Sequence, residues 1–468
     1  MLTEVKPGEA VAAINQVTRR TNRPDCLGRC RLIHLCFLLI PVLWASAQDD
    51  SGNNSTEYQK RVLESAEVDF LSSYYSQDGD NAAVSGGIGN EKLTDATGTI
   101  VVSIPLNKDD VLTIDAGISA YTSASSSNIN PFDGRGQADP FVASSGASSS
   151  DVWGNFTGSY SHSSADRNNI WSAKASVAAE FDYFSIGLGG SYSWLFNEKN
   201  TELDLTGNVY LDTWNPIYPY ELRPFGPGGR GINDPLFNVY PISGNQGYNP
   251  DFTEFDKRNR NSYALGLGLS QIFSKNAQGV LLVDLIRQEG LLSTPFQRVY
   301  FQDVPDSFIE GFQLADDIER LPNSRFKVAV GGRFNYYINA SLVLRTYYRY
   351  YQDDWGVHSH TASIEVPVKL SDAFTIYPLY RYYDQTAADY FAPYETHLST
   401  DPYYTSDYDL SKYQANQYGL GVRYTDIFTH LKIWEFGLKS IDLKFNAYER
   451  NTGLTSYIIT TGLNFVMD

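Results

Sequence analysis

The sequence predicts an all-β fold, a membrane-spanning antiparallel β-barrel of about 16 strands, within a range of about 14–18. Polar and apolar residues alternate with period two along most of the chain after residue 66, which is the pattern of strands with two different faces. The predicted strands are mostly about 10–14 residues long, as a tilted strand that crosses a bilayer requires, whereas globular strands are about 5–6 residues long. Tyrosine and tryptophan gather near the strand ends, which suits an interfacial aromatic girdle.

Composition excludes several other classes of protein. The chain has 468 residues, with 34 Tyr, 25 Phe and 37 Gly but only 2 Met, and a net charge of −18. Its many aromatic residues exclude a disordered chain. The absence of any run of about 18 apolar residues excludes a helical membrane protein. The negative charge argues against binding to nucleic acid.

The first 47 residues are predicted to be an export signal. A basic region that includes Arg19, Arg29 and Arg31 precedes the short apolar stretch 32–44. Small residues at Ala45 and Ala47 then fit a cleavage site that makes Gln48 the new N-terminus. The apolar stretch is too short to span a bilayer easily as an uncleaved anchor helix. The predicted organisation is a signal peptide (1–47), a flexible periplasmic tail (48–65) and an outer-membrane barrel (66–468).

All three cysteines, Cys26, Cys30 and Cys36, lie within this leader. The exported chain would therefore have no disulfide, no thiolate metal site and no covalently attached haem. We expect no cofactor.

The strands follow one another along the whole barrel region. The stretch 325–338 shows the alternation well, because Lys327 and Arg333 fall on one parity while Phe326, Val330 and Phe334 fall on the other. The same test, applied in order, predicts strands near 66–76, 94–106, 110–122, 152–164, 170–182, 184–196, 200–214, 258–273, 278–288, 325–338, 341–353, 357–370, 373–384, 411–425, 438–450 and 453–467.

The connections between these strands are predicted to differ at the two ends of the barrel. Short turns such as 107–109, 197–199 and 371–372 alternate with the long stretches 123–151, 215–257, 289–324 and 385–410. Outer-membrane barrels have short periplasmic turns and long extracellular loops. Loop 215–257 is rich in Pro, Gly and aromatic residues, so we expect it to fold over or into the mouth.

Four segments are distinctive: Tyr74–Gly79, Val84–Leu93, Thr122–Ser126 and Tyr192–Trp214. They resemble a bacterial family catalogued only as a domain of unknown function, number three-five-seven-zero, and the likeness extends from about residue 66 to the C-terminus. The resemblance implies an outer-membrane barrel, with genes often near those of a periplasmic flavin transferase and a small lipoprotein. It implies no catalytic residues. One departure from general barrel practice is that the chain ends Phe465-Val466-Met467-Asp468 rather than in an aromatic residue.

The strongest candidate site is a basic wall. Seven cations occupy the polar parity of the tenth to fourteenth predicted strands: Lys327, Arg333, Arg345, Arg349, Lys369, Arg381 and Arg423. Each would cost about 2–4 kcal/mol if it faced lipid at the bilayer midplane, so we expect them to line the lumen. Asp115, Glu180 and Asp442 are expected on the opposite arc, with Glu365 inside the wall. Such charges either attract anions into a pore or pair with one another to fill a closed barrel.

Other motifs have simpler explanations. Asp78 and Asp80 are able to bind Ca²⁺, but a tight turn accounts for them equally well. His358 and His360 share one face of a strand without an evident third metal ligand. The spacing of Gly226, Gly228 and Gly231 matches a dinucleotide fingerprint with no strand before it and no helix after it. His162 and His430 lack a nearby nucleophile, so we expect no enzyme.

These patterns predict an outer-membrane channel or translocation pore for small anionic or zwitterionic solutes. The alternative is a closed structural or docking barrel that anchors a periplasmic lipoprotein, with a flavin or redox link, or an extracellular partner. The partners expected in either case are outer-membrane lipid and the barrel-assembly machinery, and no nucleic acid.

Overall fold

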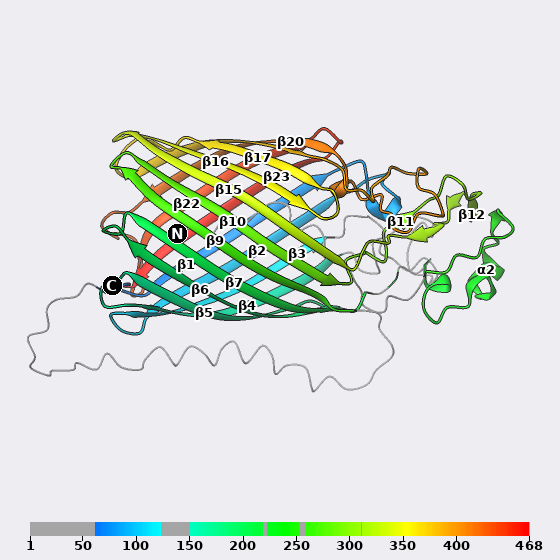
Figure 1. The fold of residues 1–468 in the computed structure, drawn as a ribbon, viewed down its shortest axis with the longest axis horizontal. Helices are drawn as coiled ribbons and strands as arrows, with labels where there is room; N and C mark the ends of the chain where they lie inside the picture. Colours follow the sequence, from blue (N-terminus) through cyan, green and yellow to red (C-terminus); the bar gives the residue numbers. More distant parts are fainter. Residues whose placement is uncertain are drawn as a thin grey trace, which may run out of the picture. The chain divides into compact units, whose positions relative to one another are not determined.

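The computed structural model describes residues 61–122, 150–216, 218, 222–252, 258–309 and 311–467. They form a closed antiparallel barrel (Figure 1) in which each strand pairs with its neighbours in sequence, and the first strand pairs with the last. The first half of the barrel consists of β1 (Glu67–Asp78), β2 (Leu93–Pro105), β3 (Asp110–Thr122), β4 (Ser150–Ser163), β5 (Asn169–Ala179), β6 (Tyr183–Phe196), β7 (Thr201–Trp214) and β9 (Arg260–Ser274).

The second half consists of β10 (Ala277–Gly290), β15 (Ser324–Asn339), β16 (Leu342–Asp353), β17 (His358–Glu365) continued by β18 (Val368–Lys369), β19 (Phe374–Gln385), β20 (Tyr413–Thr425), β22 (Phe436–Arg450) and β23 (Thr455–Met467). Pro367 has no N–H to donate, so β17 and β18 are two parts of one strand. The barrel therefore has 16 strands, and the predicted fold class is confirmed. Every predicted strand is present, with ends within a few residues of the expected ones.

The two faces of the wall differ as the alternation predicts. Large apolar side chains are exposed at every second position, for example Tyr263, Leu265, Leu267 and Leu269 along β9. The positions between them carry polar and charged residues. A barrel whose outer surface is an apolar band is suited to lipid. We call the positions of opposite parity lumen-facing. Within the described residues, no helix is long and apolar enough to cross a membrane.

The connections are of two kinds. At one end, six turns of two to five residues and a longer connection, 426–435, join the strands; we call this the short-turn end. At the other end lie the long connections, which hold the one-turn helices η2 (Ala83–Ser85), η3 (Arg223–Phe225), η4 (Gly231–Asn233), α2 (Leu236–Val239) and η5 (Tyr408–Leu410). Short strands are also present: β8 (Ser243–Gly244), β11 (Arg298–Val299), β12 (Ser307–Ile309), β13 (Phe312–Gln313) and β14 (Asp317–Ile318), with β21 (Lys432–Ile433) at the short-turn end.

The described parts of connections 79–92, 215–259, 291–323 and 386–412 pack into one structure beyond the strand ends, which we call the cap (Figure 1). Phe225 and Phe252 share a hydrophobic core with Ile309 and Ile318. Strands β8, β12 and β13 form a small sheet that joins the same two loops. Loop 215–257, expected over or in the mouth, therefore packs in its described part against the loop that follows β10.

The other two loops are joined to this core by specific contacts. Bridges pair Phe301 with His397 and Arg320 with Tyr404, which ties 386–412 to 291–323. The Arg298 guanidinium, 1% exposed, donates a hydrogen bond to the Val84 carbonyl oxygen and so ties in 79–92. The cap is thus a folded unit built from loops that are far apart in sequence.

Candidate functional site: the lumen and its cap

Charge is divided between two arcs of the barrel wall. Strands β1 to β7 contain ten acidic residues and a single basic one, Lys174. Strands β15 to β20 and β22 contain eleven basic residues and five acidic ones. The two arcs are separated by β9 and β10 on one side and by β23 on the other, so they face one another across the lumen. Charges of opposite sign therefore predominate on opposite sides of the barrel.

The acidic arc includes Asp115 of β3, which accepts a hydrogen bond from Asn155 Nδ2 at 3.3 Å. Lumen-facing Asp69 of β1 accepts one from Asn464 Nδ2 at 2.6 Å, and Asp204 of β7 accepts one from the Ser193 hydroxyl. These partners are neutral amides and hydroxyls. They orient the carboxylates without cancelling their charge.

In the basic arc, some cations are paired. Arg345 Nη1 lies 2.8 Å from Glu365 Oε1, and Lys444 Nζ lies 3.9 Å from Glu365 Oε2. Lys444 belongs to β22 and Glu365 to β17, with β19 and β20 between them. A contact that reaches over two strands requires the concave side of the wall, which agrees with a lumen-facing position for all three residues.

Asp442 is an exception to the expected arrangement. It lies on β22, next to Arg423 of β20, and the Arg423 Nε atom is 2.7 Å from Asp442 Oδ2. The Tyr377 hydroxyl also donates to Asp442, with its ring over Gly421, where any side chain would collide with the ring. Asp442 therefore belongs to the basic arc, and its expected place on the opposite arc was wrong.

Other cations of the wall lie beside more distant carboxylates or aromatic rings. Arg349 lies 3.6 Å from Asp284 of β10, and the Arg333 guanidinium lies 5.7 Å from the centre of the Tyr347 ring. Lys327 is lumen-facing, like Arg333, and lies opposite Asp353 in the register of β15 and β16. The Arg381 Nε atom is buried and has no hydrogen-bond partner. The basic arc therefore keeps an excess of positive charge after its internal pairs are counted.

Two predicted lining residues lie at the ends of the lumen. Lys369 Nζ pairs with Asp372 Oδ1 at 2.8 Å in the turn after β18, at the short-turn end. Glu180 lies in the turn between β5 and β6 rather than in a strand, and accepts a hydrogen bond from the Tyr121 hydroxyl. Burial raises the pKa of Glu180 to about 7. Neither residue lies along the middle of the wall, so Glu180 is not part of an opposite arc.

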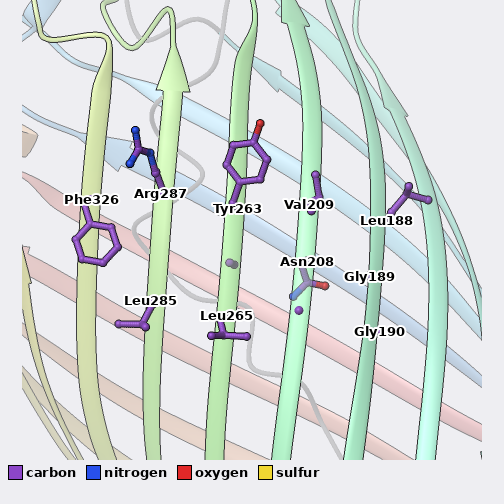
Figure 2. A pocket seen from close by; sticks show the side chains of 12 residues that line it. Leu188, Gly189, Gly190, Asn208, Val209, Tyr263, Leu265, Leu285, Arg287 and Phe326 are labelled. Atoms are coloured by element: carbon purple, nitrogen blue, oxygen red, sulfur yellow. The ribbon is translucent and has the colours of Figure 1, made fainter.

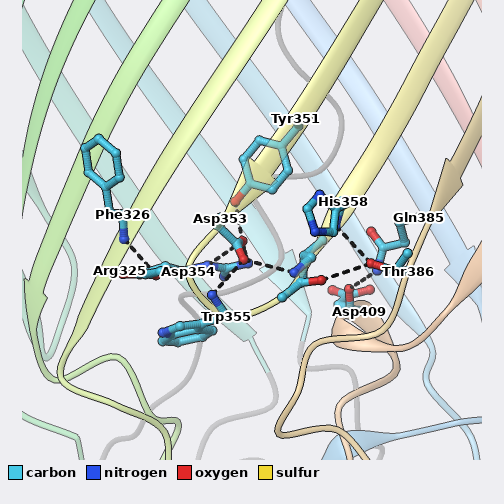
Figure 3. A network of polar contacts seen from close by, with 12 residues as sticks. Arg325, Phe326, Tyr351, Asp353, Asp354, Trp355, His358, Gln385, Thr386 and Asp409 are labelled. Carbon is cyan, nitrogen blue, oxygen red and sulfur yellow. Dashed lines mark hydrogen bonds and ion pairs between the residues drawn. The ribbon is translucent and has the colours of Figure 1, made fainter.

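The cap contacts lumen-facing side chains (Figure 3). Lumen-facing Gln385 of β19 donates through Nε2 to the carbonyl oxygens of Asp409 and Ser411, at 2.9 and 2.6 Å. Arg450 of β22 pairs with Asp409 Oδ1 at 2.5 Å, and Gln77 Nε2 donates to the Glu91 carbonyl oxygen at 3.3 Å. Loops 386–412 and 79–92 are therefore held against the inner wall at the cap end.

A second set of contacts holds the short connection between β16 and β17. Asp353 accepts hydrogen bonds from Arg325 Nε at 2.9 Å and from the Tyr351 hydroxyl at 2.6 Å (Figure 3). The Arg325 guanidinium lies 4.3 Å from the centre of the Trp355 ring. Trp355 packs with Leu292 of the cap in a buried cluster. The wall and the cap share one continuous network here.

Buried carboxyl groups are concentrated in the cap. Glu319, 2% exposed, accepts hydrogen bonds from the Thr294 N–H and the Thr405 hydroxyl, each at 2.6 Å. Burial, and then the Asp407 charge, raise the pKa of Glu319 to about 8. Burial likewise raises the pKa of Glu91 and of Asp407, with a further contribution from Asp409. Burial therefore disfavours the ionised forms of these three carboxyl groups in the folded cap.

A groove of about 500 Å³ lies on the wall between β6 and β15 (Figure 2). Its side chains include Leu188, Tyr263, Leu265 and Phe326, which belong to the exposed apolar positions. The groove therefore opens on the outer surface of the barrel and is not part of the lumen.

The possible metal ligands named from the sequence lie in the expected strand or turn but do not form a metal site in the described residues. Asp78 ends β1 and lies 3.3 Å from Lys92 Nζ, while Asp80 lies in the turn that follows. Over the ranges that the structure describes, no three His, Cys, Asp or Glu residues are grouped as a metal would require. His358 and His360 bond to the hydroxyls of Tyr350 and Tyr348. The cleavage site at Ala45, Ala47 and Gln48 lies outside the described residues.

Sequence reasoning missed part of the lining. Lys444, Asp69, Asp204 and Lys174 all occupy lumen-facing positions in predicted strands. The parity rule that identified Arg345 applies to them equally, so the signal was present. The cap contacts had no such signal, because loop residues follow no period.

Comparison with solved structures finds barrels of outer membranes. A bacterial polysaccharide outer-membrane secretin is 10% identical, with 86% of this chain and 98% of that chain covered and a TM-score of 0.40. A BenF-like porin from Pseudomonas fluorescens is 7% identical, with coverage of 86% and 100% and a TM-score of 0.39. OpdK from Pseudomonas aeruginosa is 8% identical, with coverage of 86% and 99% and a TM-score of 0.36. At these scores the likeness adds nothing to what the strand pairings show.

No curated protein matches the chain. A family profile, described as "Protein of unknown function (DUF3570)", matches residues 36–454. The match covers most of the barrel, from β1 to the end of β22, and agrees with the resemblance carried by Tyr74–Gly79 and Tyr192–Trp214. The chain belongs to this family, DUF3570.

Proposed function

We propose that this protein is an outer-membrane channel whose lumen favours small anionic or zwitterionic solutes. The division of the lumen charge into an acidic arc (β1–β7) and a basic arc (β15–β22) supports the proposal. A barrel that only needed to fill its interior would gain most from pairing each cation with a nearby carboxylate, since an uncompensated charge away from water is costly. Here the cations outnumber the carboxylates within their arc. The excess charge suits mobile counter-ions in water.

The apolar outer surface and the asymmetry of the connections support placement in an outer membrane. Short turns at one end and a large cap at the other are the arrangement of bacterial outer-membrane barrels. In that orientation the cap is extracellular, and the short-turn end is periplasmic. The cap contacts made by Gln385 and Arg450 then form a restriction at the extracellular mouth.

The test is the ion selectivity of the purified protein in a planar bilayer. Arg381→Gln removes one lumen cation, and adding Arg333→Gln removes a second. We expect the ratio of anion to cation permeability to fall in that order. Arg287→Gln is the matched control, because Arg287 has the parity of the exposed apolar residues and lines the outer groove. Heat-modifiable migration on a gel shows that each variant is a folded barrel.

A conducting barrel whose selectivity is the same in all variants contradicts the basic wall as a functional element. A folded, inserted barrel that never conducts contradicts the channel. The second candidate function, a closed barrel that docks a periplasmic lipoprotein with a redox role or an extracellular partner, would then take its place. The contacts of loops 79–92 and 386–412 with lumen-facing Gln77, Gln385 and Arg450 favour this alternative, because they hold loops against the inner wall.

A further inference from the structure

The connection 426–435 differs from all other turns at its end of the barrel. The other six turns there have two to five residues, whereas this one has ten. It carries five large apolar side chains that are between 56% and 92% exposed: Ile427, Phe428, Leu431, Ile433 and Trp434. Trp434, the most exposed, lies in the two-residue turn between β21 and β22. Contiguous apolar exposure on this scale marks an interaction surface.

The backbone of this connection is fixed by its own contacts. Buried Asp426 accepts a hydrogen bond from the Leu431 N–H at 3.1 Å and lies 3.1 Å from His430 Nδ1. The His430 contact, and then the Leu431 N–H, lower the pKa of Asp426. The Leu438 N–H donates to the Leu431 carbonyl oxygen at 2.7 Å. The apolar side chains are thus presented by an ordered scaffold rather than by a collapsed loop.

The same end of the barrel already carries an apolar belt. Five of its short turns have an exposed apolar residue in the turn or in the strand ends that flank it: Leu106, Phe196, Phe273, Ile338 and Leu370. Two further belt residues lie at the same end: Trp171 follows the turn between β4 and β5, and Trp194 precedes the turn between β6 and β7. Aromatic and aliphatic residues at this level mark the boundary between lipid and water. Connection 426–435 continues the belt between β20 and β22. It carries five exposed apolar residues, whereas the other turns have one or two each.

We propose that connection 426–435 binds the phospholipid–water interface of the leaflet at the short-turn end, as an anchor that rests on that leaflet. The inference depends on the proposed placement of the barrel in a membrane. Trp and Phe are suited to this boundary because their rings are apolar and tolerate polar headgroups. His430 and Lys432 alternate with the apolar residues, and basic residues of this kind face headgroup phosphates in interfacial segments.

Site-directed labelling tests the proposal in the full protein with Cys26, Cys30 and Cys36 replaced by serine, because residues 61–467 contain no cysteine. A nitroxide is attached at Trp434→Cys in vesicles of phosphatidylethanolamine and phosphatidylglycerol. Its collisions with oxygen, which concentrates in lipid, are compared with its collisions with a water-soluble nickel complex. Phe196→Cys is the control for the lipid belt, and Lys275→Cys, an exposed polar residue of the turn after β9, is the control for water.

We expect the label at 434 to behave like the label at 196, with high access to oxygen and low access to nickel. A label at 434 that behaves like the label at 275 overturns the proposal. A label that neither reagent reaches also overturns it, because another protein or a second copy then covers the surface. If the nickel complex also reaches the label at 196, the belt does not face lipid and the proposed placement of the barrel in a membrane is wrong. This outcome differs from failure of the anchor alone, in which only the label at 434 is accessible to nickel.

A second measurement avoids the cysteine substitution. Brominated lipid quenches tryptophan fluorescence, and the loss of quenching in Trp434→Phe, relative to the unaltered protein, isolates the contribution of Trp434. We expect a measurable share of the quenching to disappear. Equal quenching in the two proteins contradicts contact between Trp434 and lipid.

Discussion

Replacing Glu319 with glutamine should make the cap more stable above pH 7 and nearly unchanged at pH 5. Burial raises the pKa of Glu319 from 4.5 to about 8. Since the raised pKa belongs to an acid, the folded cap is favoured most at low pH, and stability is lost as pH rises from about 4.5 to about 8. Each pKa unit corresponds to about 1.36 kcal/mol. The cost of closing the cap over this group is therefore about 3 kcal/mol at pH 7 and about 5 kcal/mol above pH 8.

Glutamine removes that cost but changes one hydrogen bond. The amide oxygen still accepts from the Thr294 N–H, as Glu319 Oε1 does at 2.6 Å. The amide NH₂ replaces the oxygen that accepts from Thr405, whose hydroxyl must reverse and accept instead. A rearranged buried hydrogen bond costs about 1 kcal/mol. The net gain is therefore about 2 kcal/mol at pH 7 and about 4 kcal/mol above pH 8.

Hydrogen exchange of the cap amides, measured at pH 5, 7 and 9 and corrected for the intrinsic rates, reads this stability directly. We expect the protection of Thr294 and Arg320 in the unaltered protein to fall between pH 5 and pH 9, and to fall much less in Glu319→Gln. Glu91 and Asp407 leave a smaller pH dependence in both proteins. If the two proteins lose protection equally over this range, Glu319 does not titrate as its burial requires, and the reasoning fails.

Three further changes test the cap and the wall. Arg298→Ala should lower the free energy of cap opening by about 2–3 kcal/mol, because it leaves the Val84 carbonyl oxygen without its buried donor; protease resistance of the cap unchanged from the unaltered protein would contradict this. Gly290→Val should prevent formation of a heat-modifiable barrel, since Gly290 has φ +113° and a Cβ there would lie 1.8 Å from the Asn259 carbonyl oxygen; a variant that migrates normally would show that the junction can shift. Trp355→Ala should lower cap stability by about 3–5 kcal/mol, measured by hydrogen exchange at low pH, and a loss below about 1 kcal/mol would mean that its cluster is not well packed.

The barrel could be predicted from sequence because its physical cause is periodic. A residue in a barrel strand faces either lipid or the lumen, and neighbours alternate, so Phe326 and Lys327 reveal their surroundings by parity alone. The predicted strand 110–122 and the observed β3 (Asp110–Thr122) coincide for this reason. Strand ends were less certain where polar residues of a turn continue the alternation, which is how Glu180 came to be placed in a strand.

The cap and the pairing of the lumen charges could not be predicted in the same way. Alternation gives the face on which Glu365 and Lys444 lie, but their contact over two intervening strands depends on the curvature of the closed wall. Arg298 and Val84 show the same limit in the cap, because their hydrogen bond joins residues separated by 214 positions. Nothing in either local segment indicates the other.

That separation also determines when the cap is able to form. Ordering two loops against each other is costly in chain entropy until the segments between them are fixed. Loop 79–92 follows the first strand, and its partners in loops 291–323 and 386–412 come within reach once β15 to β23 have joined and the last strand has met the first. The cap is therefore a late step in biogenesis, and its resistance to protease reports that the barrel has closed. Until then, apolar residues such as Phe252 and Ile318 remain exposed. Proteases that degrade misfolded proteins would therefore cleave these loops in a barrel that has not closed, whereas the same loops are protected in the closed barrel.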